Sequence, residues 1–227
     1  MFEFHNVGAS YAGLVALKGI SLSVAAGERL AVFGHNGAGK TTLLKCAVGS
    51  HDAMTGEVRF RGEPIVPGQV FRNVRRGIGF VPQGHNVFRE LSVEQNLSIA
   101  GLLHDRHAIG QVYELFPILT ERRRQIAGSL SGGQQQMLAL GMALMTKPAI
   151  LLLDEPTTGL APVIASNVLR GLQTINQTMD TAIVIVEQNV PATLKAVDRA
   201  VILKSGSIVF DGSAEHLASE PDLWAWF

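Results

Sequence analysis

The stretch of this sequence best suited to chemistry is G-H-N-G-A-G-K-T-T, Gly34–Thr42. Its spacing, G-x-x-x-x-G-K-[ST], lets the backbone curl so that several N–H groups point toward a bound phosphate. The flanks support this interpretation, because an apolar strand is predicted at 29–34 and a helix at 41–49. The N-terminal end of that helix would add its partial positive charge to the same site. The stretch therefore predicts the phosphate-binding loop of a nucleotide site.

The side chains at the end of this loop have separate predicted tasks. Lys40 would reach the β- and γ-phosphates of ATP, and the Thr41 hydroxyl would bind Mg²⁺. The residues assigned to nucleotide binding here are Gly34, His35, Asn36, Gly37, Ala38, Gly39, Lys40, Thr41 and Thr42.

A second apolar strand, ILLLDEP at 150–156, ends in two acids. Asp154 would hold Mg²⁺ directly or through a water molecule, and Glu155 would be the general base for an attacking water. Two adjacent carboxylates at the end of a buried strand are unfavourable unless a cation or a water network meets them. An ATP-hydrolysing site meets this condition, and the alternative is a solvated helix start before Pro156.

The stretch SLSGGQQQMLALGMALM at 129–145 predicts another helix N-terminus that could bind an anion. Ser131 is the expected N-cap, and Gln134 is placed to reach back to it. The glycines between them leave backbone N–H groups open to a ligand. This helix end lies far along the sequence from the phosphate loop. One nucleotide cannot obviously use both within a single chain, whereas the ATP of a partner chain can.

The composition narrows the class of protein. Lys and Arg together number 19, as do Asp and Glu, and this balance argues against a dedicated nucleic-acid binder or a polybasic membrane anchor. Cys46 is the single cysteine, which excludes an intrachain disulfide and fits a reducing compartment. The first residues do not have the pattern of a signal peptide, and no apolar run reaches the ~18–20 residues of a membrane span. We therefore expect a soluble chain.

The remaining elements must position these motifs. From Pro148 onward, short apolar strands alternate with helices, which predicts a parallel, doubly wound sheet. The segment 84–136 has a helical pattern, with a capping box at Ser92–Gln95, and looks like an insert on that sheet. Earlier strands are predicted at 2–7, 20–24, 29–34 and 77–83, with a hairpin-like stretch at 56–65. We predict an α/β fold of the P-loop NTPase type, forming a single domain at 1–227.

Four motifs occur in an order that resembles the nucleotide-binding domains of ABC transporters, over nearly the full length. They are Gly34–Thr41, Phe80–Gln83, Leu130–Gln134 and Ile150–Glu155. The resemblance implies a RecA-like parallel core with an N-terminal antiparallel β subdomain in 1–83 and 137–227, and a helical subdomain in 84–136. More narrowly, the chain is similar to ATPase subunits of branched-chain amino-acid importers and their urea and amide relatives. The residues that carry this are 81–97, 131–145, 154–162 and 186–189.

The resemblance also implies roles for single residues. Tyr11 matches the aromatic residue that stacks on adenine, and the alternative is a half-buried tyrosine at a strand end. Gln83 would touch Mg²⁺ or the attacking water and sense the membrane partner. The metal ligands implied are therefore Thr41, Gln83 and Asp154. The residues expected to contact the nucleotide of a partner chain are Ser131, Gly132, Gly133 and Gln134.

Two departures from the family pattern bear on the ATP site. Gln188 stands where most relatives carry a histidine that hydrogen-bonds the γ-phosphate, and it belongs to the polar trio Glu187–Asn189 at the end of the apolar strand 183–186. An amide can donate such a bond but cannot titrate near neutral pH. The alternative is that the polar residues merely end this strand. At 158–160, Thr-Gly-Leu stands where relatives have a stretch ending in Asp, so contacts of that Asp across a dimer are not expected here.

The implied function is that of the ATP-binding and hydrolysing subunit of an ABC importer for branched-chain or related neutral amino acids. The alternatives are a urea or short-chain amide importer, an exporter of envelope lipid, or an ABC ATPase that acts on nucleic acid. The expected cofactors are ATP and Mg²⁺. The expected partners are a second ATPase subunit, identical or different, transmembrane permease subunits and, indirectly, a solute-binding protein, with no nucleic acid. The expected location is the cytoplasmic face of a bacterial or archaeal membrane. The solute and the task of the C-terminal aromatic residues stay open.

Overall fold

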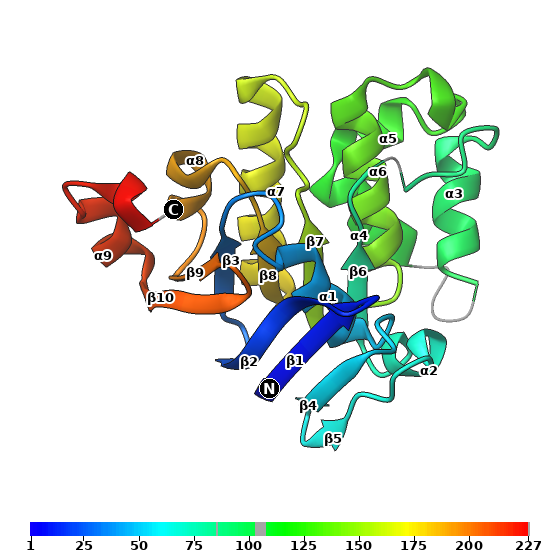
Figure 1. The fold of residues 1–227 in the computed structure, drawn as a ribbon. Helices are drawn as coiled ribbons and strands as arrows, with labels where there is room; N and C mark the ends of the chain where they lie inside the picture. The colour runs from blue at the N-terminus through cyan, green and yellow to red at the C-terminus, as the bar shows by residue number, and fades with distance from the viewer. Residues whose placement is uncertain (85, 103–107, 227) are drawn as a thin grey trace.

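A six-stranded sheet forms the centre of the computed structural model, which describes residues 1–84, 86–102 and 108–226 (Figure 1). Its strand order is β10-β9-β3-β8-β7-β6, and all neighbours are parallel except the antiparallel pair β9 and β10. The parallel sheet expected from the alternating pattern is confirmed. In chain order the strands are β3 (Arg29–Phe33), β6 (Ile78–Val81), β7 (Ile150–Asp154), β8 (Ala182–Val186), β9 (Arg199–Lys204) and β10 (Ser207–Ser213).

Both faces of this sheet are buried, which explains its nearly continuous apolar strands. In β3, Leu30 and Val32 join the core on one face, while Ala31 and Phe33 join the core on the other. The first core is closed by α1 (Lys40–Val48) and by an antiparallel sheet. The second is closed mainly by α6 (Gly132–Leu144) and α7 (Pro162–Met179). The strand ends that carry polar residues are therefore held between two packed layers.

The antiparallel sheet has the order β2-β1-β4-β5. It consists of β1 (Phe2–Tyr11), β2 (Leu14–Val24), β4 (Met54–Phe60) and β5 (Glu63–Pro64). The first two strands are longer than predicted, because they continue to a tight turn at Ala12 and Gly13, both with positive φ. A two-residue turn of this kind fits the twist of a hairpin. Tyr11 and Leu14 are thereby placed opposite each other at the tip.

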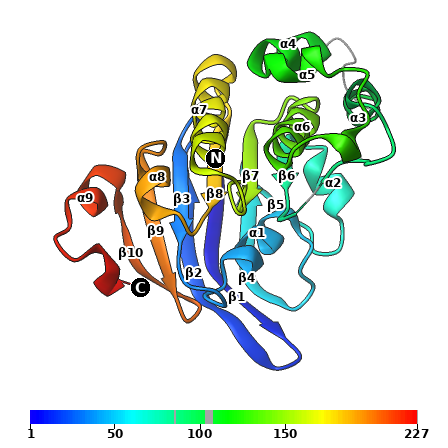
Figure 2. The ribbon, with the colours of Figure 1, turned by 90° about the horizontal axis from the view of Figure 1, so that it is seen from above.

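The segment predicted to be helical contains α3 (Val93–Ala100), α4 (Ile109–Leu115), α5 (Pro117–Glu121) and the start of α6. The expected capping box is present, since the Gln95 N–H donates to the Ser92 hydroxyl and the Ser92 N–H donates to the Gln95 side chain. Helix α6 runs past residue 136, where the predicted boundary of a helical subdomain falls. Figure 2 shows these helices at one end of the molecule and the C-terminus at the other.

The C-terminal segment packs on its own chain. Helices α8 (Val190–Leu194) and α9 (Ala214–Ser219) precede a short turn of helix at Leu223–Trp226. The Trp226 ring meets the Phe210 ring edge-on, with 5.3 Å between centroids. The sequence left the task of the C-terminal aromatic residues open, and Trp226 is now seen to pack on its own chain. Phe227 lies outside the described residues.

Two shorter features complete the fold. Helix α2 (Val70–Val74) was not predicted from the sequence. Cys46 lies in α1 and is fully buried, and burial raises the pKa of its thiol to about 12, as expected for a packing residue. None of the helices in the described part of the chain is both long and apolar enough to cross a membrane.

Candidate nucleotide-binding and hydrolysis site

The predicted phosphate loop joins β3 to α1, and its glycines are required by geometry. Gly34 has φ +150°, and a Cβ there would lie 2.3 Å from the Leu203 carbonyl oxygen. Gly39 has φ +107°, and a Cβ there would lie 2.7 Å from the Ala16 carbonyl oxygen. Larger residues are therefore excluded by strain and by contact. The loop is a backbone cradle next to a helix N-terminus, as predicted.

Lys40 lies folded over this loop. Its ammonium group donates to the carbonyl oxygens of Gly34 at 2.7 Å and His35 at 3.1 Å. The side chain is only 5% exposed, and burial lowers its pKa, while Glu155 and Asp154 act in the opposite direction. An ammonium group has three N–H donors, so one remains for an anion in the cavity that Lys40 lines.

Asp154 ends β7 next to Thr41, and the Thr41 hydroxyl donates to its Oδ1 at 3.2 Å. The carboxylate is 2% exposed; burial raises its pKa, and the bond from Thr41 lowers it. With the amide oxygen of Gln83, these residues offer the oxygen ligands that Mg²⁺ prefers. In the described residues, no three His, Cys, Asp or Glu side chains form a metal-binding group. The set therefore fits an ion that takes its other ligands from water and nucleotide phosphates.

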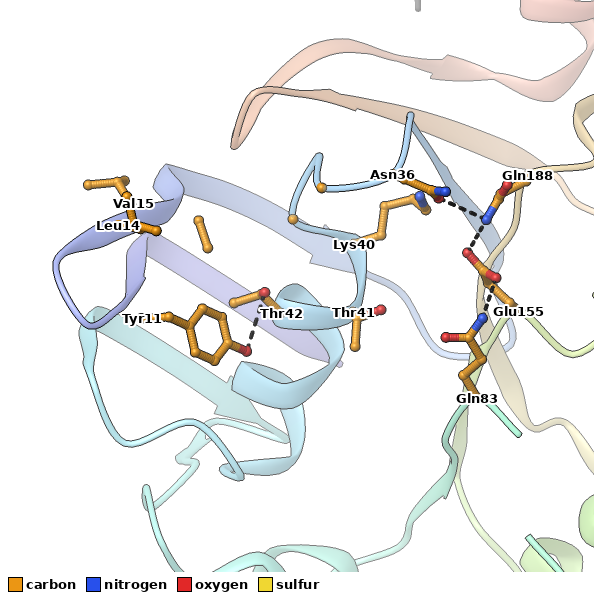
Figure 3. A pocket seen from close by; sticks show the side chains of 13 residues that line it. Tyr11, Leu14, Val15, Asn36, Lys40, Thr41, Thr42, Gln83, Glu155 and Gln188 are labelled. Carbon is orange, nitrogen blue, oxygen red and sulfur yellow. Dashed lines mark hydrogen bonds between the residues drawn. The ribbon is translucent and has the colours of Figure 1, made fainter. Parts of the chain in front are cut away.

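The segments that follow β6, β7 and β8 come together at the Glu155 side chain (Figure 3). Its carboxylate accepts hydrogen bonds from the Gln188 amide at 2.6 Å, the Gln83 amide at 2.7 Å and the Thr158 hydroxyl at 3.2 Å. The Gln188 amide also donates to the Asn36 side chain at 3.0 Å. Gln83 follows β6, Glu155 and Thr158 follow β7, and Gln188 follows β8, while Asn36 belongs to the phosphate loop. The carboxyl ends of parallel strands lie at one edge of the sheet, so these residues are close together.

Tyr11 stands at the far end of the same cavity (Figure 3). Its ring is 42% exposed, and its hydroxyl accepts a bond from Thr42 at 3.5 Å. The His51 ring packs at 4.6 Å between centroids, and the Lys45 ammonium lies 5.7 Å from the ring centre. An exposed aromatic ring that neighbouring side chains hold in position can stack on a base. Its role as the adenine platform stays a prediction.

The cavity between Tyr11 and Glu155 has a volume of about 550 Å³. Of the predicted loop residues, Gly34, His35 and Ala38 shape the loop without lining this cavity. Leu14 and Val15, exposed at the hairpin tip, line it and were not predicted; their only signal was an apolar pair at a strand end. The lining residues are Tyr11, Leu14, Val15, Ala16, Asn36, Gly37, Gly39, Lys40, Thr41, Thr42, Gln83, Glu155 and Gln188.

The helix cap expected at the second predicted anion site is present, away from the phosphate loop. The Ser131 hydroxyl accepts from the Gln134 N–H at 3.4 Å, and the Ser131 N–H donates to the Gln134 side chain at 3.0 Å. Ser131 and Gly132 are exposed, Gln134 is half-buried, and Gly133 is buried against Ile164. None of the four lines the cavity of the phosphate loop. Their contact with a partner chain's nucleotide stays a prediction.

Glu187 and Thr157 form a buried pair that was not predicted from the sequence. The Glu187 side chain is 1% exposed and accepts hydrogen bonds from the Thr157 N–H at 2.8 Å and the Thr157 hydroxyl at 2.7 Å. A glutamate that follows four β-branched residues is easily interpreted as a solvated strand end. No signal in the sequence showed that it turns inward.

Known proteins match this chain over most of its length. The ABC transporter family matches residues 17–158. The high-affinity branched-chain amino acid transport ATP-binding protein BraG of Pseudomonas aeruginosa is 41% identical, with 97% of this chain and 96% of that protein covered. A probable branched-chain amino acid transport ATP-binding protein LivF of Archaeoglobus fulgidus is 36% identical, with 96% and 94% covered.

Solved structures agree on the fold. The chain superposes on cbiO1 from Clostridium perfringens, part of the ABC transporter complex cbiONQ, with a TM-score of 0.89 and 25% identity over 98% of this chain and 92% of that one. It superposes on the ADP conformation of the ATP-binding cassette MJ1267 with a TM-score of 0.88 and 24% identity, covering 100% and 97%. The fold and the cavity define a P-loop nucleotide-binding protein. The chain belongs to the ABC transporter family and is one of its ATPases.

Proposed function

We propose that this chain is the ATPase subunit of an importer of branched-chain or related neutral amino acids. The observation that carries the proposal is its full-length similarity to BraG, a transport ATP-binding protein for branched-chain amino acids. The similarity to the LivF protein points to the same solutes. In such a subunit the chain binds ATP, pairs with a second ATPase and passes the resulting motion to membrane permeases.

Hydrolysis would proceed at the junction around Glu155. The carboxylate takes a proton from a water molecule, whose oxygen attacks the γ-phosphorus of ATP while the bond to the bridging oxygen breaks and ADP leaves. Lys40 and the loop N–H groups hold the phosphates in line. Mg²⁺, held by Thr41, Asp154 and Gln83, would neutralise charge on the β- and γ-phosphates. Tyr11 would stack on the adenine.

The site would be completed by a second chain. Ser131, Gly132, Gly133 and Gln134 form a helix N-terminus, exposed at Ser131 and Gly132, that suits the γ-phosphate of a nucleotide held by a partner. ATP that binds the closed pair more tightly than the open one drives closure, and hydrolysis reverses it. The partner is a second ATPase subunit, and the pair would dock on permease subunits at the cytoplasmic face of the membrane.

Gln188 supports hydrolysis as a fixed amide donor. Gln188→Ala is expected to lower kcat by about tenfold or more, because it removes a hydrogen bond to a charged group at the reaction centre. Gln188→His should keep activity and add a bend to the kcat–pH profile near ~6.5, where imidazole titrates. The wild type should lack that bend. Steady-state phosphate release between pH 5.5 and 9 measures kcat and its pH profile. Normal turnover in Gln188→Ala would show that Gln188 merely follows the strand and has no part in hydrolysis.

Uptake assays test the proposed solutes. Cells lacking this chain should lose uptake of radiolabelled leucine and regain it when wild-type protein is supplied, but not when Glu155→Gln is supplied. Urea and acetamide uptake measured in parallel separate the related importer classes. Restored urea or amide uptake, with leucine unchanged, would contradict the amino-acid assignment and leave the ATPase assignment standing.

A further inference from the structure

Glu187 joins two segments of the hydrolysis site, although it lies outside the four motifs that define the nucleotide site. Its Oε1 accepts both hydrogen bonds from Thr157, which lies two residues after Glu155. Its Oε2 accepts a hydrogen bond from the backbone N–H of Gln188 at 3.2 Å. A single carboxylate therefore holds the turn that carries Glu155 and the segment that carries Gln188.

A buried carboxylate is unfavourable, so its presence needs a reason. Burial raises the pKa of Glu187, the nearby Glu155 carboxylate raises it further, and the bonds from Thr157 and Gln188 lower it. Within the described residues, the Glu187 carboxylate accepts these hydrogen bonds and forms no direct ion pair, although its charge raises the pKa of Lys40. An apolar side chain would fill such a position without this cost. An apolar side chain could not accept the hydrogen bonds that hold Thr157 and the Gln188 backbone in place.

Hydrogen bonds on both sides of Pro156 join the turn after β7 to the C-terminal end of β8 and the residue that follows it. Before the proline, the Glu155 N–H donates to the Val186 carbonyl oxygen at 2.8 Å. After it, Thr157 donates to Glu187. Glu155 itself has φ +50°, a strained value for a residue with a side chain, which persists only where neighbours fix it. Loss of the second attachment would let the Glu155 carboxylate move away from Gln188.

We propose that Glu187 is a positioning residue for ATP hydrolysis. It sets the separation between the Glu155 carboxylate and the Gln188 amide, which are 2.6 Å apart, and acts through Thr157 and the Gln188 backbone. It does not line the nucleotide cavity. The inference rests on the proposed function, in which Glu155 is the general base and Gln188 contacts the γ-phosphate.

The test is a kcat and KM comparison of variants at both ends of the contact. Glu187→Ala is expected to lower kcat by about 10- to 100-fold, since a misplaced base loses that much, while KM for ATP changes by less than about threefold. Thr157→Val should lower kcat less and add little further loss in the Glu187→Ala background, which is the signature of coupled residues. In Glu187→Gln the amide oxygen can still accept from Thr157, but the NH2 group then faces the Gln188 backbone N–H, so that two donors face each other. The kcat of this variant should therefore be intermediate.

Thr181→Val is the matched control. Thr181 is buried, and its hydroxyl donates to the Pro148 carbonyl oxygen at 2.9 Å, near the opposite ends of β7 and β8. The variant loses a comparable buried hydrogen bond, so Tm should fall as in Thr157→Val while kcat stays at the wild-type value. A fall in kcat equal to that of Thr157→Val would overturn the inference, because general loosening would then explain both.

Further outcomes separate this inference from the proposed function. If Glu155→Gln is inactive while Glu187→Ala and Thr157→Val turn over within about twofold of wild type, Glu187 is not a positioning residue. If Glu155→Gln retains normal turnover, the assignment of Glu155 as general base fails, and with it the part of the proposed function on which this inference rests. Should Glu187→Ala not fold, Glu187→Gln and Thr157→Val carry the same comparison, and a normal kcat in both overturns the inference.

Discussion

Replacing Glu155 with glutamine is expected to lower kcat for ATP hydrolysis by about 100-fold or more. The amide has nearly the shape of the carboxylate but cannot take a proton from water at neutral pH. Affinity for ATP should be retained, because Lys40 and the phosphate loop are unchanged. Phosphate release measures the first effect, and titration with a fluorescent ATP analogue measures the second.

An exposed glutamate supplies the control for this variant. Glu121, at the end of α5, lies on the surface, and Glu121→Gln should hydrolyse ATP at the wild-type rate. Turnover of Glu155→Gln within about threefold of wild type would show that another group is the base. Asp154, the adjacent residue, would then be a candidate, since burial raises the pKa of its carboxyl group.

Lys40→Ala is expected to weaken ATP binding by about 10- to 100-fold, the loss typical of a hydrogen bond to a charged group. The substitution removes the cation that faces the β- and γ-phosphates and leaves the carbonyl oxygens of Gly34 and His35 without their donor. Lys195→Ala, at an exposed position after α8, should bind ATP normally. Equilibrium dialysis with labelled ATP gives both affinities, and unchanged affinity in Lys40→Ala would contradict the phosphate-loop interpretation.

The phosphate loop and the strand-end acids could be predicted because their chemistry depends on local spacing. Gly34, Gly39 and Lys40 act through backbone conformation and a helix end, both of which the sequence encodes within a few residues. Asp154 and Glu155 follow an unmistakable buried strand. The order of strands in a parallel sheet then brings these motifs to one edge. The position of Gln188 beside Glu155 follows from the same rule.

Other parts of the site depend on contacts that no local pattern encodes. The hairpin turn at Ala12 and Gly13 lacks the usual Asn-Gly signal, so the strand extension that brings Leu14 and Val15 into the cavity was missed. Glu187 turns inward because Thr157, thirty residues away, offers two donors. Side-chain pairs of this kind are set by tertiary packing, and a single sequence gives no measure of them.

The central claim is that ATP joins two chains around the phosphate loop of one and the Ser131 helix end of the other. Light scattering of the Glu155→Gln variant with ATP and Mg²⁺ tests it most directly, because slow hydrolysis would preserve the closed pair. We expect a mass of twice 24.3 kDa with ATP, and a single chain when Ser131→Arg is added to block the helix end. A mass that stays at 24.3 kDa with saturating ATP, or a dimer that persists with Ser131→Arg, would contradict it.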